Sequence, residues 1–146
     1  MKHIPTVTRV LEGLVFFVFG LNFFFHFIPQ PQNVPPAAAS FAGALFASGY
    51  FFVLLKVIEV ASGIALLANR FVPLALTILA PIVVNILAFH LFLEPAGLPV
   101  AIVVVALEIA NAWFYRDAFR SVVAARVTPA VPKSSGSRES HEHAHA

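Results

Sequence analysis

Apolar residues run along the chain in four long stretches that are separated by short polar segments. The stretches extend over about residues 8–28, 49–68, 71–93 and 96–115. A helix that crosses the hydrocarbon core of a membrane needs roughly 20 predominantly apolar residues. Because the runs are continuous rather than alternating, they do not match the strands of a membrane barrel. The pattern therefore predicts an all-α protein, a transmembrane four-helix bundle.

The segment between the first two stretches is different in character. Residues 29–36 are rich in proline, which lacks the backbone N–H and fixes φ, so we expect an irregular segment there. Residues 37–48 then resume a pattern of small and apolar residues. Two interpretations stay open for them, a short helix lying at the outer interface or an extension of the second span.

Basic residues gather on one side of the predicted membrane. Lys2 and Arg9 lie near the start of the chain, and Arg70 lies between the second and third stretches. Further basic residues follow the fourth stretch, namely Arg116, Arg120, Arg126, Lys133 and Arg138. The segment 29–48 carries no charge, and the loop before the fourth stretch carries only Glu94. The positive-inside rule then predicts that both the N-terminus and the C-terminus are cytoplasmic.

The end of the chain differs from the rest in composition. After residue 126 the sequence contains prolines, serines and the alternating histidines His141, His143 and His145. No other donor group is organised around these histidines, which favours a solvated tail over a weak metal site. The sequence therefore predicts a four-span membrane domain over residues 1–126, a disordered cytoplasmic tail over 127–146, and no metal centre.

Composition supports the membrane interpretation. Of the 146 residues, 60% are hydrophobic and 11% are charged, whereas a soluble domain has about 45–50% apolar and about 25% charged residues. A chain of this length cannot hide such a surplus in its interior, so lipid is the expected solvent. The absence of Cys excludes disulfide and dithiol chemistry within the chain.

Sequence motifs of soluble enzymes are also missing. The sequence contains no phosphate-binding loop, no dinucleotide fingerprint and no G-x-S-x-G or H-E-x-x-H motif. The basic residues belong to loops rather than to the face of a folded domain, so nucleic acid is not an expected partner. Membrane lipids are the expected partners of those loops.

Polar residues inside the apolar stretches are costly in lipid and normally face the bundle interior or a wet cavity. A functional site is therefore expected among Glu12, Asn22, His26, Lys56, Glu59, Asn85, Glu108 and Asn111. Lys56 and Glu59 are three residues apart on one helix face and should form an ion pair. We expect Arg9 or Arg116 to reach toward the carboxyls of the first and fourth spans. His26 and His90 are interpreted as interface histidines rather than metal ligands.

Several of these residues occur within longer motifs of the first three stretches. The first stretch carries Arg9, Gly13 and Gly20. The second and third carry Ile58-Glu59, Gly63, Leu66-Leu67, Arg70, Pro73-Leu74-Ala75-Leu76, Ala80-Pro81-Ile82, Asn85-Ile86 and Phe89-His90. Over about residues 7–116 the sequence resembles the DoxX family of small bacterial membrane proteins. The resemblance implies a four-helix bundle in the bacterial inner membrane. Some relatives are associated with thiosulfate oxidation coupled to quinone, and others with membrane oxidoreductase complexes.

Three functions are compatible with these features. The first is an accessory, non-catalytic inner-membrane protein that acts through partner helices or binds a lipid-like or quinone molecule. The second is a quinone-linked membrane oxidoreductase subunit, with the quinone head near Lys56, Glu59, His26 and Asn85. The third is a small proton-coupled transporter that uses Glu59 and Glu108. Quinone is the only cofactor suggested, and the expected partners are lipids, an oxidoreductase or further copies of the chain.

Overall fold

Helices form all of the regular secondary structure in the computed structural model, which describes residues 3–29 and 33–126. The expectation of an all-α fold is confirmed over these ranges. The predicted tail over 127–146 lies outside them. The helices are α1 (Ile4–Phe25), α2 (Pro36–Ala47), α3 (Phe51–Leu67), α4 (Val72–Phe92), the short 3-10 helix η1 (Pro95–Gly97), α5 (Leu98–Phe114) and α6 (Arg116–Phe119).

Three of the described helices are long and apolar enough to cross a membrane. They are α1, α4 and the segment Pro95–Phe114, which joins η1 to α5. A fourth crossing requires that α2 and α3 be counted together, because α3 alone has 17 residues. The chain thus has the helices of a multi-pass membrane protein, with three candidate spans or four if the bent pair α2–α3 is one.

The bend between α2 and α3 distinguishes the two interpretations of residues 37–48. The two helices meet at 92°, so α2 is a separate helix rather than a straight extension of α3. Gly49 lies between them with a φ of 77°. That backbone conformation favours glycine, which has no Cβ to clash. The chain therefore changes direction at Gly49, which adopts a positive φ without steric strain.

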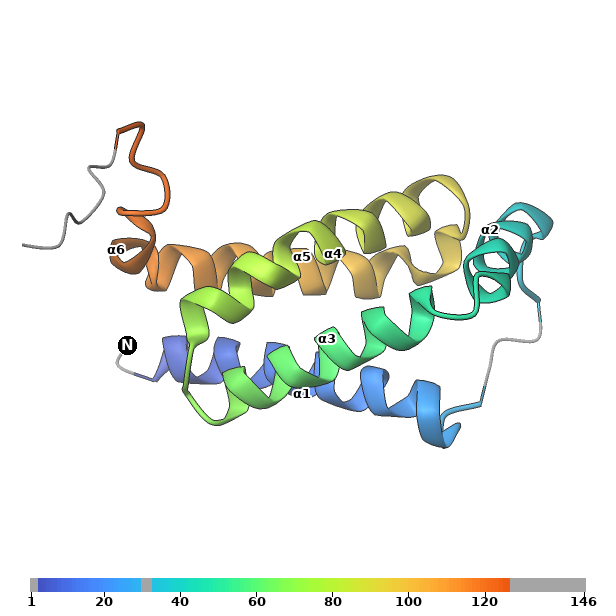
Figure 1. The fold of residues 1–146 in the computed structure, drawn as a ribbon, viewed down its shortest axis with the longest axis horizontal. Coiled ribbons are helices and arrows are strands. Elements are labelled where there is room, and N and C mark those ends of the chain that lie inside the picture. The colour runs from blue at the N-terminus through green and yellow to red at the C-terminus, as the bar shows by residue number, and fades with distance from the viewer. Residues whose placement is uncertain (1–2, 30–32, 127–146) are drawn as a thin grey trace, which may run out of the picture.

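The four long helices each contact two others. α1 packs along α3 and α5, and α4 packs against α5 and α3. Figure 1 shows that α1 begins and α5 ends at the same end of the molecule, where α6 and the α3–α4 loop also lie. We call this end, with Arg9, Arg70 and Arg116, the arginine end. The opposite end is covered by α2, which contacts α3, and is called the α2 end.

Glycines allow α1 and α3 to approach closely. A Cβ placed on Gly63 of α3 would lie 2.7 Å from the backbone nitrogen of Phe17 and 2.9 Å from the carbonyl oxygen of Gly13. A Cβ on Gly20 would lie 2.7 Å from a methyl carbon of Val60. Small residues at such crossings allow backbones to approach in lipid, where helices gain no hydrophobic energy from pairing.

The distribution of polarity differs from that of a soluble bundle. Large apolar side chains of α3 point outward and are about half exposed, for example Val53, Leu54, Val57 and Ile64. In contrast, the buried residues include Glu12, Glu59, Glu108 and Asn111 beside an apolar core. An exterior rich in large hydrophobic residues is costly in water and favourable in lipid. The tertiary structure thus agrees with the membrane interpretation of the composition.

Candidate functional site

A cavity of about 310 Å³ lies in the half of the molecule nearer the α2 end and is lined by residues of α1, α2, α3, α4 and α5. Its walls are mainly apolar, with aromatic rings from four helices, namely Phe16, Phe19, Phe41, Phe51, Phe52 and Phe89. The polar residues that line it are Lys56, Glu59, Asn85 and His90. We call this cavity the pocket.

An ion pair forms the charged part of the pocket wall. Nζ of Lys56 lies 2.8 Å from Oε2 of Glu59, which confirms the pairing expected from their spacing on one helix. The Glu59 side chain is 4% exposed, whereas that of Lys56 is 20% exposed. A buried carboxylate needs such a partner, because burial without one is costly. The pair presents both a hydrogen-bond donor and an acceptor to a cavity that is otherwise apolar.

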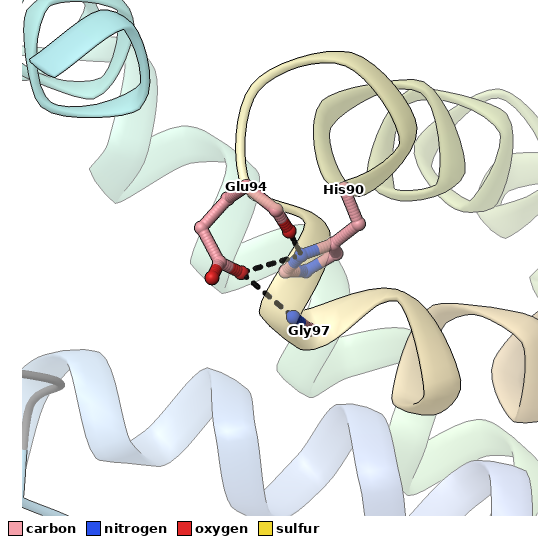
Figure 2. Close-up of polar contacts among 3 residues, drawn as sticks. All are labelled: His90, Glu94 and Gly97. Atoms are coloured by element: carbon pink, nitrogen blue, oxygen red, sulfur yellow. Dashed lines mark hydrogen bonds and ion pairs between the residues drawn. The ribbon is translucent and has the colours of Figure 1, made fainter. Parts of the chain in front are cut away.

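His90, which was interpreted from the sequence as an interface histidine, also lines the pocket. An ideal helix places it far around α4 from Asn85, yet both residues line the pocket. Figure 2 shows its ring held by the turn that follows α4, where Nδ1 lies 2.9 Å from Oε2 of Glu94 and 3.0 Å from the Glu94 carbonyl oxygen. The spacing of four residues between His90 and Glu94 was the available signal for this contact.

A second polar cluster lies inside the molecule toward the arginine end. Asn111 of α5 donates from Nδ2 to Oε2 of Glu12 at 2.6 Å, and it accepts at Oδ1 from the Thr8 hydroxyl at 2.8 Å. Glu108, one turn before Asn111, is also buried. Among the described residues, Oε1 of Glu12 and Oε2 of Glu108 have no hydrogen-bond partner. We call Thr8, Glu12, Glu108 and Asn111 the carboxyl cluster; none of the four lines the pocket.

The expected pairing of an arginine with these carboxyls is wrong. The Arg9 guanidinium instead donates to the carbonyl oxygens of Leu66 and Leu67, the latter at 3.5 Å. The last carbonyls of a helix have no partner within it, so the C-terminus of α3 offers buried acceptors for Arg9. Arg116 donates to the Trp113 carbonyl oxygen at 3.0 Å, and its guanidinium lies 5.0 Å from the centre of the Trp113 ring.

Asn22 and His26 end α1 and do not line the pocket. Asn22 accepts at Oδ1 from the backbone N–H of Ile28 at 2.7 Å. His26 has a φ of 52°, its N–H donates to the Asn22 carbonyl oxygen, and its side chain is exposed. The oxidoreductase interpretation placed His26 beside Lys56 and Glu59 around the quinone head, but His26 does not line that pocket. Glu12 and His26 share a face of α1. However, a rise of about 1.5 Å per residue places them about 20 Å apart along the helix.

The described residues contain no group of three or more His, Cys, Asp or Glu side chains that could hold a metal ion. Comparison of the chain with protein-family models, curated proteins and solved structures finds no match. Because a fold alone does not determine a function, the chemistry of the pocket and of the carboxyl cluster carries the functional conclusion.

Proposed function

We propose that the chain is a DoxX-like protein of the bacterial inner membrane that binds an amphipathic molecule, a quinone or a lipid, as an accessory component of a membrane complex. In this proposal α1, the bent pair α2–α3, α4 and α5 form a transmembrane four-helix bundle. The arginine end is cytoplasmic. The common position of the start of α1, the α3–α4 loop and α6 supports this orientation, because their arginines then obey the positive-inside rule.

The pocket is the observation that carries the proposal. Its volume of about 310 Å³ is at the lower end of the roughly 300–1,000 Å³ typical of small-molecule sites. Aromatic rings from several helices suit an apolar ring or chain, and the Lys56–Glu59 pair suits a polar head. A molecule with both parts would satisfy the charged and the apolar walls together.

A quinone-linked oxidoreductase subunit is the second candidate, and the grouping of Asn85 and His90 with the ion pair favours it. These side chains supply hydrogen-bond donors and acceptors within one cavity, as the head of a quinone requires. Because the chain has no Cys, a thiol electron donor would belong to a partner protein. An accessory binder and a redox subunit would use the same pocket and differ in whether the bound molecule turns over.

The test is analysis of the molecules that co-purify with the protein from native membranes. We expect one stoichiometric quinone or lipid in the extract of the wild type. Ala42 lines the pocket, whereas Ala39 on the same helix does not. Ala42→Trp should therefore lose the bound molecule, and Ala39→Trp should keep it.

Bulk phospholipid alone in all three preparations would contradict the binding proposal. If a quinone is bound, its reduction by an added membrane fraction would distinguish the redox subunit from the accessory binder. A stoichiometric protein partner that co-purifies without redox turnover would support the accessory role.

A further inference from the structure

The turn after α4 holds the His90 ring in one orientation. Nδ1 faces two oxygen atoms of Glu94, one from the carboxylate and one from the backbone carbonyl. Neither oxygen carries a proton when the carboxyl is ionised, so both can only accept. The hydrogen must then sit on Nδ1, as when a carboxylate orients a functional histidine. In the neutral ring this leaves Nε2 with a lone pair and no hydrogen.

Gly97 completes this arrangement from the other side of the turn. Its N–H donates to Oε2 of Glu94 at 3.0 Å, which fixes the same oxygen that faces His90 (Figure 2). A Cβ on Gly97 would overlap the His90 ring. The φ of Gly97 is −85°, an ordinary value, so it is the space rather than the backbone conformation that requires glycine here. His90 is thus held by Glu94 and packed on Gly97.

Nε2 of His90 forms no hydrogen bond with any residue in the described ranges, and His90 lines the pocket. We propose that Nε2 accepts a hydrogen bond from a hydroxyl group of the molecule in the pocket, so that the ligand is an amphipathic alcohol or phenol. Glu94 acts as a positioning residue for this contact. The inference rests on the proposed function, because it specifies the ligand of the same pocket.

The lone pair on Nε2 of His90 determines which ligand groups are preferred at this position. A hydroxyl can donate to Nε2, whereas a carbonyl or ether oxygen offers only lone pairs of its own. An analogue that lacks the O–H donor would leave Nε2 of His90 without a hydrogen-bond partner, which disfavours its binding. The hydroquinol form of a quinone would therefore bind better at this position than the oxidised form, and an alcohol better than its methyl ether.

The experiment measures binding of two probes to the purified full-length protein in detergent by equilibrium dialysis. The probes are nonylphenol and its methyl ether, nonylanisole, which share a tail and ring and differ in the O–H donor. One hydrogen bond corresponds to a preference of about three- to tenfold for the phenol. In His90→Phe this preference should disappear. In His26→Phe, which changes an exposed histidine outside the pocket, it should remain.

Variants of Glu94 test the positioning role. The carbonyl oxygen of a glutamine can still accept from Nδ1, so Glu94→Gln should keep most of the preference, and Glu94→Ala should reduce it. Equal binding of the two probes to the wild type, or a preference that survives in His90→Phe, would overturn the inference while leaving the pocket as a binding site. Failure of both probes to bind the wild type would overturn the proposed function as well.

Discussion

Asn111 on α5 donates a hydrogen bond from Nδ2 to Oε2 of Glu12 on α1 at 2.6 Å, and both residues are 0% exposed. The amide is oriented by the Thr8 hydroxyl, which donates to its oxygen. A side chain with one donor and one acceptor end thus links two positions of α1 to α5. The contact supplies the buried Glu12 carboxyl with a partner that the expected arginine does not provide.

Replacement of Asn111 by leucine should destabilise the protein. The change removes the hydrogen bond to Glu12 and leaves its carboxyl unsatisfied, which costs about 1–3 kcal/mol. Unfolding of the purified protein by denaturing detergent should show the loss. Asn85→Leu is the matched control, because Asn85 is exposed and makes no side-chain hydrogen bond within the described residues. Equal losses in both variants would contradict the role of Asn111.

A methyl group on Gly63 should separate α1 from α3. The new Cβ would meet backbone atoms of Phe17 and Gly13, which cannot move aside as a flexible side chain can. We expect Gly63→Ala to lower the free energy of unfolding by about 1–3 kcal/mol. Gly43→Ala on α2 meets nothing within 4 Å and should have no such effect. A Gly63→Ala protein as stable as the Gly43→Ala protein would show that this close approach is not required.

The Lys56–Glu59 pair should show energetic coupling in a double-mutant cycle. Lys56→Met leaves the Glu59 carboxyl without its partner, whereas the double variant with Glu59→Gln removes both charges. We expect a coupling energy of about 1–2 kcal/mol, which is reduced by the partial exposure of Lys56. The exposed pair Asp117–Arg120 has the same spacing and is the control, with no measurable coupling expected. Equal coupling energies in the two pairs would contradict the prediction that burial strengthens the Lys56–Glu59 interaction.

The orientation in the membrane can be tested by labelling single cysteines, since the chain has none of its own. Ser40 on α2 and Ser121 after α6 are both exposed and lie toward opposite ends of the molecule. A membrane-impermeant maleimide added to intact spheroplasts should label Ser40→Cys and not Ser121→Cys. After lysis both should react. The reverse pattern in intact cells would show that the arginine end is not cytoplasmic.

Features that depend on a single helix were predictable from the sequence. The Lys56–Glu59 ion pair follows from a spacing of three residues, which places two side chains on one face of any helix. The long apolar stretches likewise correspond to α1, α4 and α5, because continuous hydrophobicity requires no knowledge of neighbours. Their bounds differ by a few residues, since α1 begins at Ile4 and ends where Asn22 and His26 form its terminus.

Features that depend on two or more helices were not predictable in the same way. Arg9 binds carbonyl oxygens of Leu66 and Leu67, acceptors that every residue possesses and that no sequence pattern marks. The pocket joins His90 to Asn85 because residues of α1, α2, α3 and α5 surround that part of α4. Angular position around one helix cannot reveal such a site, since the cavity is shaped by its neighbours.

By itself, the sequence determined the helical class, the long apolar segments, the asymmetry of the basic residues and the ion pair on α3. These properties arise from the local periodicity of a helix and from the cost of placing charge in lipid. Only the tertiary structure separated the polar residues into a pocket, a carboxyl cluster and a helix terminus. That separation depends on the distance along each helix and on which neighbouring helices pack at each level, because side chains on one face can still lie several turns apart.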